Sequence, residues 1–215
     1  MEGSASLLVF VAVLAGKVWS ASMSESLTTA HGRSYVRGII PDSVNRERDD
    51  FYPTPPRVTL ALLGVEAFTG PIWEPACGDG AISKVLEDIG HAVHSTDLID
   101  RGYGIPHRDF LLDYETRADN IITNPPFKFA EEFARHALSR TTGKVALLCR
   151  LAWLEGKARR LMFEETPLAH VWVFSARVPM LRGGVDFGKG GGGMIAFAWF
   201  VWDHAHQGKP TLGWI

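Results

Sequence analysis

The sequence has 215 residues, of which 46% are hydrophobic, 21% are charged and 11% are aromatic. This length and composition predict one globular domain and exclude a disordered, a collagen-like or a coiled-coil protein. The formal net charge is only −2, so a nucleic-acid partner would have to be bound by a local basic face. Residues 150–189 could supply that face, because they contain seven Lys or Arg and four Asp or Glu.

The first 45 residues are expected to form an N-terminal extension with little stable structure, followed by one domain at 46–215. An apolar run at 7–15 precedes small residues at 20–22. This pattern allows three interpretations, namely sequence upstream of the true start, a loosely packed extension, or a secretory signal peptide. The run is shorter than the roughly 20 apolar residues that span a bilayer, so we expect no stable membrane association.

The cysteine and histidine content argues against a structural metal or a disulfide framework. Cys77 and Cys149 are too few for either a set of disulfides or a four-cysteine zinc site. They favour a reducing, cytoplasmic location. His204 and His206 lack accompanying ligands, so we predict no metal site.

From residue 57 onward, apolar and polar stretches alternate as repeated strand and helix units. The predicted helices cover residues 57–68, 81–89, 127–138 and 155–164. The predicted strands cover residues 70–74, 91–97, 120–124, 144–151, 170–174 and 194–202. This order favours an α/β fold with an open, doubly wound, mostly parallel sheet. In such a sheet, ligands bind beyond the carboxyl ends of the strands.

The first predicted strand runs into a glycine-containing turn with the sequence Glu-Pro-Ala-Cys-Gly-Asp-Gly at 74–80. Gly78 and Gly80 allow a sharp turn and a close approach by a ligand. A dinucleotide-binding turn would have a third glycine near position 83, where this chain has Ser83. The acids Glu74 and Asp79 disfavour a pyrophosphate and favour a ligand with a cationic group. The alternative is a plain strand-to-helix turn.

Two further segments carry acids that could bind a nucleoside. Asp97 ends a strand 17 residues after Gly80, where a carboxylate accepts hydrogen bonds from ribose hydroxyls. Its alternative role is to cap a helix. Asp109 and Phe110 could hold the exocyclic amine and one face of an adenine. Their alternative roles are those of a loop acid and a core phenylalanine.

The fourth segment, Asn-Pro-Pro-Phe at 124–127, ends a predicted strand. Pro125 favours an extended backbone at Asn124, and the prolines supply carbonyls without N–H groups. The side-chain oxygen of Asn124 and the carbonyl of Pro125 could accept both hydrogens of an amino group, while Phe127 offers a stacking face. This arrangement suits a weakly nucleophilic planar amine. Its alternative is a proline-terminated strand before a helix.

Together these segments resemble the class I S-adenosylmethionine-dependent methyltransferases, specifically the amino-methyltransferases with an Asn-Pro-Pro-aromatic motif. The resemblance implies a Rossmann-like, seven-stranded sheet in a single domain, with S-adenosylmethionine as the cofactor. Residues 51–56, Phe-Tyr-Pro-Thr-Pro-Pro, are similar to an N-terminal motif of adenine methyltransferases, although Pro53 precedes the threonine. The implied contacts are Tyr52, Thr54, Glu74, Gly78 and Gly80 with the methionine moiety, Asp97 with the ribose, Asp109 and Phe110 with the adenine, and Asn124, Pro125, Pro126 and Phe127 with the target amine.

The resemblance favours N6 of adenine in DNA as the target, since compact members occur among phage and bacterial DNA adenine methyltransferases. Recognition of DNA would then fall to residues 176–193, with Arg177 and Arg182, and to Arg46 and Arg48. The alternative for these arginines is a solvated surface. The alternatives are RNA N6-adenine, N4-cytosine or protein N5-glutamine methylation, a catalytically silent cofactor-binding subunit and, less favoured, an NAD-dependent oxidoreductase. Cytosine C5 methylation needs a thiolate nucleophile, typically after a proline, and is disfavoured because Cys77 lies in the glycine-containing turn and Cys149 in a predicted strand. The sequence leaves the recognition sequence and the oligomeric state open.

Overall fold

The computed structural model describes residues 51–178, 180 and 195–215. The expected extension at 1–45 therefore lies outside the described residues, as do Arg46, Arg48, Arg182 and most of the glycine-rich segment. The strands are β1 (Ile72–Glu74), β2 (Val93–Ser95), β3 (Asn120–Thr123), β4 (Lys144–Arg150), β5 (Leu168–Val173), β6 (Phe197–Asp203) and β7 (Thr211–Trp214). The α-helices are α1 (Pro56–Leu63), α2 (Ser83–Asp88), α3 (Ala130–Arg140) and α4 (Lys157–Glu165). Three short 3-10 helices are η4 (Phe110–Leu112), η5 (Phe127–Phe129) and η6 (Leu151–Leu154).

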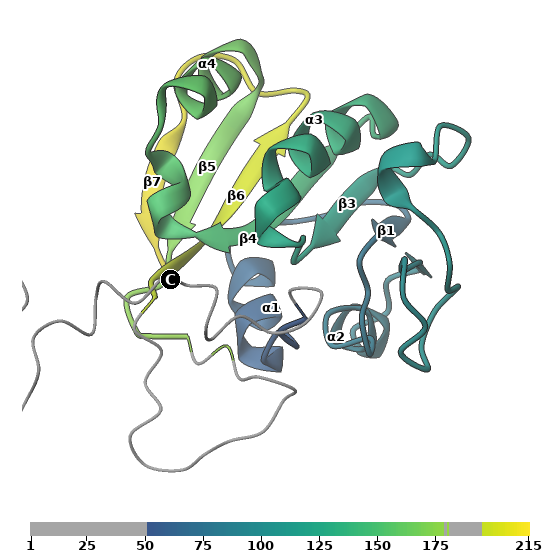
Figure 1. The fold of residues 1–215 in the computed structure, drawn as a ribbon. Coiled ribbons are helices and arrows are strands. Elements are labelled where there is room, and N and C mark those ends of the chain that lie inside the picture. Colours follow the sequence, from purple (N-terminus) through teal and green to yellow (C-terminus); the bar gives the residue numbers. More distant parts are fainter. Residues whose placement is uncertain (1–50, 179, 181–194) are drawn as a thin grey trace, which may run out of the picture. The chain divides into compact units, whose positions relative to one another are not determined.

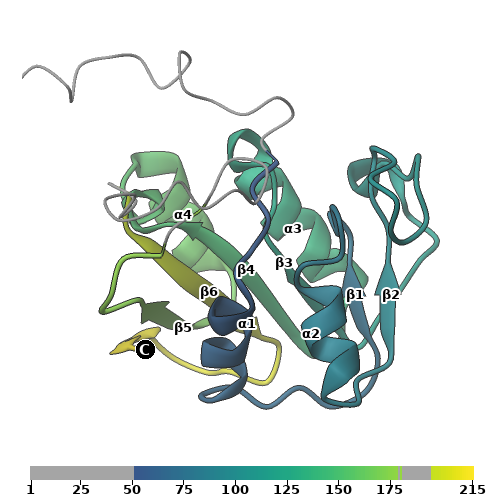
Figure 2. The ribbon, with the colours of Figure 1, turned by 90° about the horizontal axis from the view of Figure 1, so that it is seen from below.

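The seven strands form one sheet in the order β2-β1-β3-β4-β6-β5-β7. Strand β6 is antiparallel to both of its neighbours, β4 and β5, whereas the other neighbouring strands are parallel. Helices α1 and α2 cover one face of the sheet, and α3 and α4 cover the other (Figure 1, Figure 2). These features confirm the predicted α/β fold with a doubly wound, mostly parallel, seven-stranded sheet.

The strand order places a crevice between β1 and β3. From β1 the chain moves outward to β2 at one edge, and it then returns to the opposite side of β1 to form β3. Ligands of open α/β sheets bind at such a reversal, outside the carboxyl ends of the strands. The three segments after β1, β2 and β3 therefore meet at one edge of the sheet.

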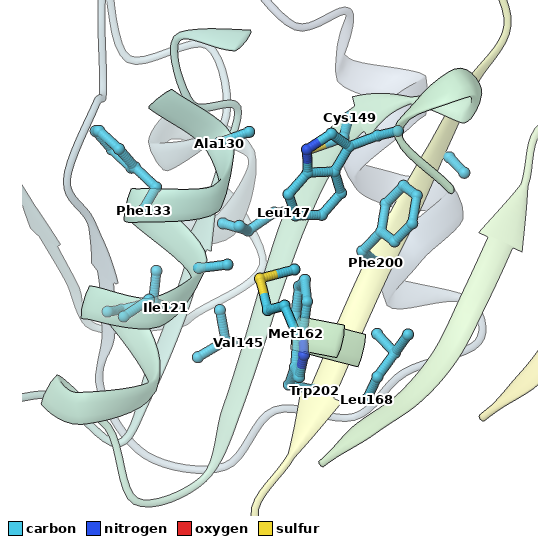
Figure 3. Close-up of a cluster of buried hydrophobic side chains, with 14 of the residues drawn as sticks. Ile121, Ala130, Phe133, Val145, Leu147, Cys149, Met162, Leu168, Phe200 and Trp202 are labelled. Carbon is cyan, nitrogen blue, oxygen red and sulfur yellow. The ribbon is translucent and has the colours of Figure 1, made fainter. Parts of the chain in front are cut away.

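The core lies on both faces of the central strands. In β4, Val145 and Leu147 pack in the cluster beneath α3 and α4, while Ala146 and Leu148 pack in the cluster beneath α1 and α2. Figure 3 shows the first cluster, in which Met162 of α4 lies beside Leu147 and Trp202. Strand β6 is buried over residues 197–202, as expected for a continuous apolar run with covered faces.

Helix α1 differs most from the predicted range of 57–68. It begins at Pro56, a residue that suits the first turn of a helix because its missing N–H would have no helical partner. It ends at Leu63, and Gly64 caps it. Phe68 still reaches the core, at 6% exposure, from outside the helix. The apolar pattern thus marked buried positions correctly but not the helix end.

Strand β7 corresponds to no strand predicted from the residue pattern. It pairs in parallel with β5 at an edge of the sheet, and three of its four residues are exposed. An exposed edge strand shows neither a continuous apolar run nor a clean alternation of apolar and polar residues, so the sequence pattern does not distinguish β7 from an irregular segment. Among the described residues, no helix is both long and apolar enough to cross a membrane.

Candidate active site

A cavity of about 340 Å³ lies at the carboxyl ends of β1, β2 and β3, within the size range of small-molecule sites. It brings together nine of the twelve predicted site residues. These are Tyr52, Thr54, Glu74, Gly78, Asp97, Asp109, Phe110, Asn124 and Pro126. The other three, Gly80, Pro125 and Phe127, do not line this cavity.

Both glycines of the turn are required by their backbone and by neighbouring rings. Gly78 has φ +58° and Gly80 has φ +82°, conformations that other residues rarely adopt. A Cβ at Gly78 would lie 2.6 Å from the ring of Phe51, and a Cβ at Gly80 would lie 2.6 Å from the ring of Tyr103. The close approach at Gly80 is therefore made by a side chain of the protein itself.

Glu74 ends β1 and anchors the start of α2. One oxygen of its carboxyl, Oε2, accepts hydrogen bonds from the Ser83 hydroxyl and, at 2.8 Å, from the Ser83 N–H. Ser83 thus has a specific partner where a dinucleotide-binding turn would have glycine. Burial raises the pKa of Glu74 well above its ordinary value, although the Ser83 bonds oppose the shift. Burial therefore disfavours the negative charge expected of Glu74 in the cavity.

Asp79 also lines the cavity, and its oxygen Oδ1 is buried with no hydrogen-bond partner among the described residues. A buried polar atom without a partner costs about 1–3 kcal/mol. A cationic ligand group at this carboxylate would remove that cost. Asp79 is therefore the residue of the turn best placed to meet the cationic group that the sequence predicted.

Asp97 uses both carboxylate oxygens to hold the loops around the cavity. Its Oδ2 accepts a hydrogen bond from the Gly78 N–H at 2.8 Å, and its Oδ1 accepts one from the Ile99 N–H at 2.8 Å. A carboxylate has about four acceptor positions. Asp97 therefore fixes the glycine turn and retains acceptor capacity toward the cavity that it lines.

Asp109 and Phe110 have the structural roles considered for them, those of a loop acid and a core phenylalanine. The Asp109 side chain accepts a hydrogen bond from the Leu111 N–H at 3.0 Å at the start of η4. Phe110 is 2% exposed, and its ring centroid lies 5.1 Å from that of Trp73 and 4.8 Å from that of Phe133. Both residues nevertheless line the cavity, so a structural role does not remove them from the site.

Asn124 follows β3, and its side chain has a defined orientation. Its Nδ2 donates hydrogen bonds to the Tyr52 carbonyl at 3.0 Å and to the Thr54 hydroxyl at 3.2 Å. The amide oxygen Oδ1 is buried and has no hydrogen-bond partner among the described residues. The 51–54 segment, predicted to join the site, thus positions the Asn124 amide with its acceptor oxygen unsatisfied.

Phe127 lies outside the first cavity and lines a second one. Its ring stacks with that of Tyr52, with centroids 5.9 Å apart and planes at 25°. The guanidinium of Arg150 lies 4.9 Å from the Phe127 centroid. The aromatic face predicted for a target base therefore has a planar cation of the protein as a neighbour.

The cavity lining also includes residues that the sequence patterns did not select, namely Phe51, Arg101, Arg108, Lys128, Phe129 and Phe133. Of these, Lys128 could have been suspected, because it directly follows the Asn-Pro-Pro-Phe segment. Arg177 is not part of the lining, and its carbonyl accepts a 3.5 Å hydrogen bond from Arg57.

Both cysteines are buried thiols. Burial and the nearby Glu74 raise the pKa of Cys77 to about 12, and burial also raises the pKa of Cys149. A thiol with a raised pKa is a poor nucleophile. Over the described parts of the chain, no cluster of three or more His, Cys, Asp or Glu side chains is suited to hold a metal ion.

No protein-family model matches the sequence, and no curated protein is significantly similar to it. Solved structures do share its fold. A Pyrococcus horikoshii protein assigned as an RNA methyltransferase has a TM-score of 0.55 and 15% identity, covering 72% of this chain and 87% of its own. A Listeria monocytogenes protein assigned to the class I S-adenosylmethionine-dependent methyltransferases has a TM-score of 0.52 and 14% identity, covering 86% and 68%.

A dimethyladenosine transferase from Plasmodium falciparum has a TM-score of 0.51 and 12% identity, covering 71% of this chain and 63% of its own. At such low identities these similarities concern the fold. The fold of the described residues is that of class I methyltransferases, as the sequence resemblance implied.

Proposed function

We propose that this protein transfers a methyl group from S-adenosylmethionine to an exocyclic amine, with N6 of adenine in DNA as the favoured target. The observation that carries the proposal is the Asn124 side chain, which is fixed by Tyr52 and Thr54 and leaves a buried acceptor oxygen unsatisfied at the first cavity. An amino group would supply the missing donor.

The residues of the first cavity fit the proposed cofactor. Asp79 offers an unpartnered carboxylate oxygen to a cationic amino group, and Asp97 offers acceptor positions to ribose hydroxyls. Asp109 and Phe110 border the same cavity and suit the amine and ring of an adenine. S-adenosylmethionine, when bound, supplies an electrophilic methyl group on a sulfonium.

The residues after β3 would act on the target amine. Asn124 would accept one of its hydrogens, and the Pro125 carbonyl is proposed as the second acceptor. Two acceptors favour the pyramidal form of the amine, in which the nitrogen lone pair is available for attack. After the transfer, the methylated nitrogen would release one of its protons to water, so no side-chain base is needed in this scheme. For a base in a duplex, flipping out of the stack would cost roughly a few kcal/mol.

The test incubates the purified protein with tritiated S-adenosylmethionine and with separate pools of DNA, RNA and protein. Nuclease digestion and mass spectrometry then identify the labelled species. We expect N6-methyladenine in DNA. Label in RNA or at glutamine would transfer the proposal to that substrate, and cofactor binding without any label would favour the silent subunit.

The matching variant is Asn124→Ala. It should lower turnover by on the order of a hundredfold or more, the scale for removing one positioned transition-state partner, while calorimetry shows nearly unchanged cofactor affinity. Full activity of this variant would contradict amine methylation at this site.

A further inference from the structure

A second cavity of about 260 Å³ lies next to the first. Its lining consists of Phe127, Lys128, Ala130, Cys149, Arg150, Ala152, Trp153 and Arg159. Lys128 lines both cavities, whereas Asn124 lines only the first. The η5 turn at 127–129 therefore separates the cofactor-sized cavity from this smaller one. A target amine at Asn124 would therefore share the first cavity with Lys128, which also lines the second.

The lining of the second cavity is strongly cationic. Lys128 comes from η5, Arg150 from the end of β4 and Arg159 from α4, and none of the lining residues that the structure describes carries a carboxylate. The Nε of Arg159 donates a 2.8 Å hydrogen bond to the Trp153 carbonyl, which fixes the guanidinium. Arginine with a fixed guanidinium is well suited to bind the oxygens of a phosphate.

Two further features favour an anionic group with an aromatic neighbour. Ala130 begins α3, an 11-residue helix without a side-chain cap at its start, and the acids of its first turn, Glu131 and Glu132, do not line the cavity. Phe127 and Trp153 supply aromatic surface in the same lining. Cationic and aromatic side chains together are typical of grooves that follow a single strand of nucleic acid.

From this placement we infer that the second cavity binds a backbone phosphate of the target polynucleotide, next to the nucleotide whose amine reaches Asn124. This inference rests on the proposed function and specifies the substrate class for it. A glutamine side chain is attached to an uncharged peptide backbone, which offers no negative charge to the cationic lining. A nucleotide is attached to a phosphate on each side.

The test measures binding of a fluorescent 12-residue oligodeoxyadenylate by anisotropy over a range of salt concentrations. The variant is Arg159→Gln, and the matched control is Arg160→Gln. Arg160 is the next residue of α4, pairs with Glu164 at 3.1 Å and does not line the cavity. Arg159→Gln should weaken binding about tenfold or more and reduce the salt slope by about 0.7. Arg160→Gln should do neither.

A third variant, Arg159→Lys, separates charge from structure. If the charge matters, lysine should restore most of the affinity and the salt slope, although it loses the bond to Trp153. If glutamine and lysine weaken binding equally, or if Arg159→Gln matches Arg160→Gln, the phosphate site is overturned. Failure of the wild-type protein to bind the oligonucleotide also overturns it.

These binding measurements do not depend on methyl transfer. Binding that depends on Arg159 without any methylation would support the phosphate site and count against the proposed function. Methylation at the same rate in Arg159→Gln as in the wild type would support the proposed function and count against the phosphate site. A parallel titration with oligoriboadenylate tests whether an RNA or a DNA backbone supplies the phosphate. We expect the oligodeoxyadenylate to bind at least as tightly as the oligoriboadenylate.

Discussion

The Nδ2 of Asn124 donates a hydrogen bond to the hydroxyl of Thr54 at 3.2 Å, across 70 residues of sequence. Thr54 is 3% exposed and lies just before α1, whereas Asn124 follows β3. This bond and the one to the Tyr52 carbonyl hold the amide nitrogen, and they leave Oδ1 as the end of the amide that has no partner among the described residues. The segment at 51–54 therefore has a positioning role in addition to any contact with a ligand.

Thr54→Val should lower kcat by up to about tenfold, the scale of one neutral hydrogen bond, with little change in KM for the methyl donor. Valine keeps the volume but removes the acceptor, so the Asn124 amide would lose one of its two fixed contacts. The control is Thr59→Val, since the buried Thr59 hydroxyl has no partner within the described ranges. Steady-state kinetics with equal losses in both variants would contradict the positioning role.

Asp97→Ala should weaken cofactor binding by about 1–3 kcal/mol, because ribose hydroxyls would lose a charged acceptor and the Gly78 N–H would lose its partner. Isothermal calorimetry measures the affinity. Asp100→Ala serves as the control, since Asp100 lies three residues away and accepts a hydrogen bond from Gly102 outside the cavity lining. An unchanged affinity in Asp97→Ala would reduce Asp97 to a structural residue of the loop.

Glu74→Gln should increase stability relative to the wild type as pH rises above about 4.5. The folded pKa of Glu74 is raised above its ordinary value of 4.5 by burial. The folded state therefore binds this proton more tightly, and the wild type loses stability between the unfolded and the folded pKa. Glutamine keeps an acceptor for Ser83 and does not ionise.

The measurement is the urea midpoint of both proteins from pH 4 to pH 8. The difference between them should be constant below the unfolded pKa and should grow in favour of glutamine above it. Asp88→Asn, at the exposed end of α2, controls for the loss of one negative charge. A difference that does not vary with pH would show that Glu74 is not protonated by its burial.

The grouping of the candidate site residues could be predicted from sequence because parallel strands bring their carboxyl ends to one edge of the sheet. Strands β1, β2 and β3 each carry a distinctive polar residue at or just after that end, namely Glu74, Asp97 and Asn124. Knowing the order of these segments was enough to expect them together. Phe110, which is buried in the core and also lines the cavity, was included because its segment follows β2 in the chain.

Contacts between loops could not be predicted in this way. Nothing in the pattern around Tyr103 indicates that its ring packs against Gly80, because that contact depends on how a loop of irregular backbone returns to the turn. Likewise, the Arg150 guanidinium above Phe127 joins the end of β4 to η5. Such pairs have no periodicity, and their partners are fixed only by the assembled sheet.

The packing of Tyr103 on Gly80 leads to a prediction that separates two reasons for a glycine in the turn. A left-handed backbone alone should make Gly80→Ala destabilise the fold by about 1–2 kcal/mol. If the Tyr103 ring also requires glycine at this position, overpacking should add about 1–3 kcal/mol. Gly90→Ala supplies the reference, because Gly90 has φ +95° and open space around a Cβ.

The decisive measurement is a double-mutant cycle of Gly80→Ala with Tyr103→Ala, followed by urea unfolding and by calorimetric titration of the cofactor. Removal of the ring should recover the steric part of the loss, so the two substitutions should be strongly non-additive in stability. Cofactor affinity should recover together with stability. If Gly80 instead made room for a ligand, the affinity would stay low in the double variant, because the added methyl group would still occupy the ligand's place whatever happened to Tyr103.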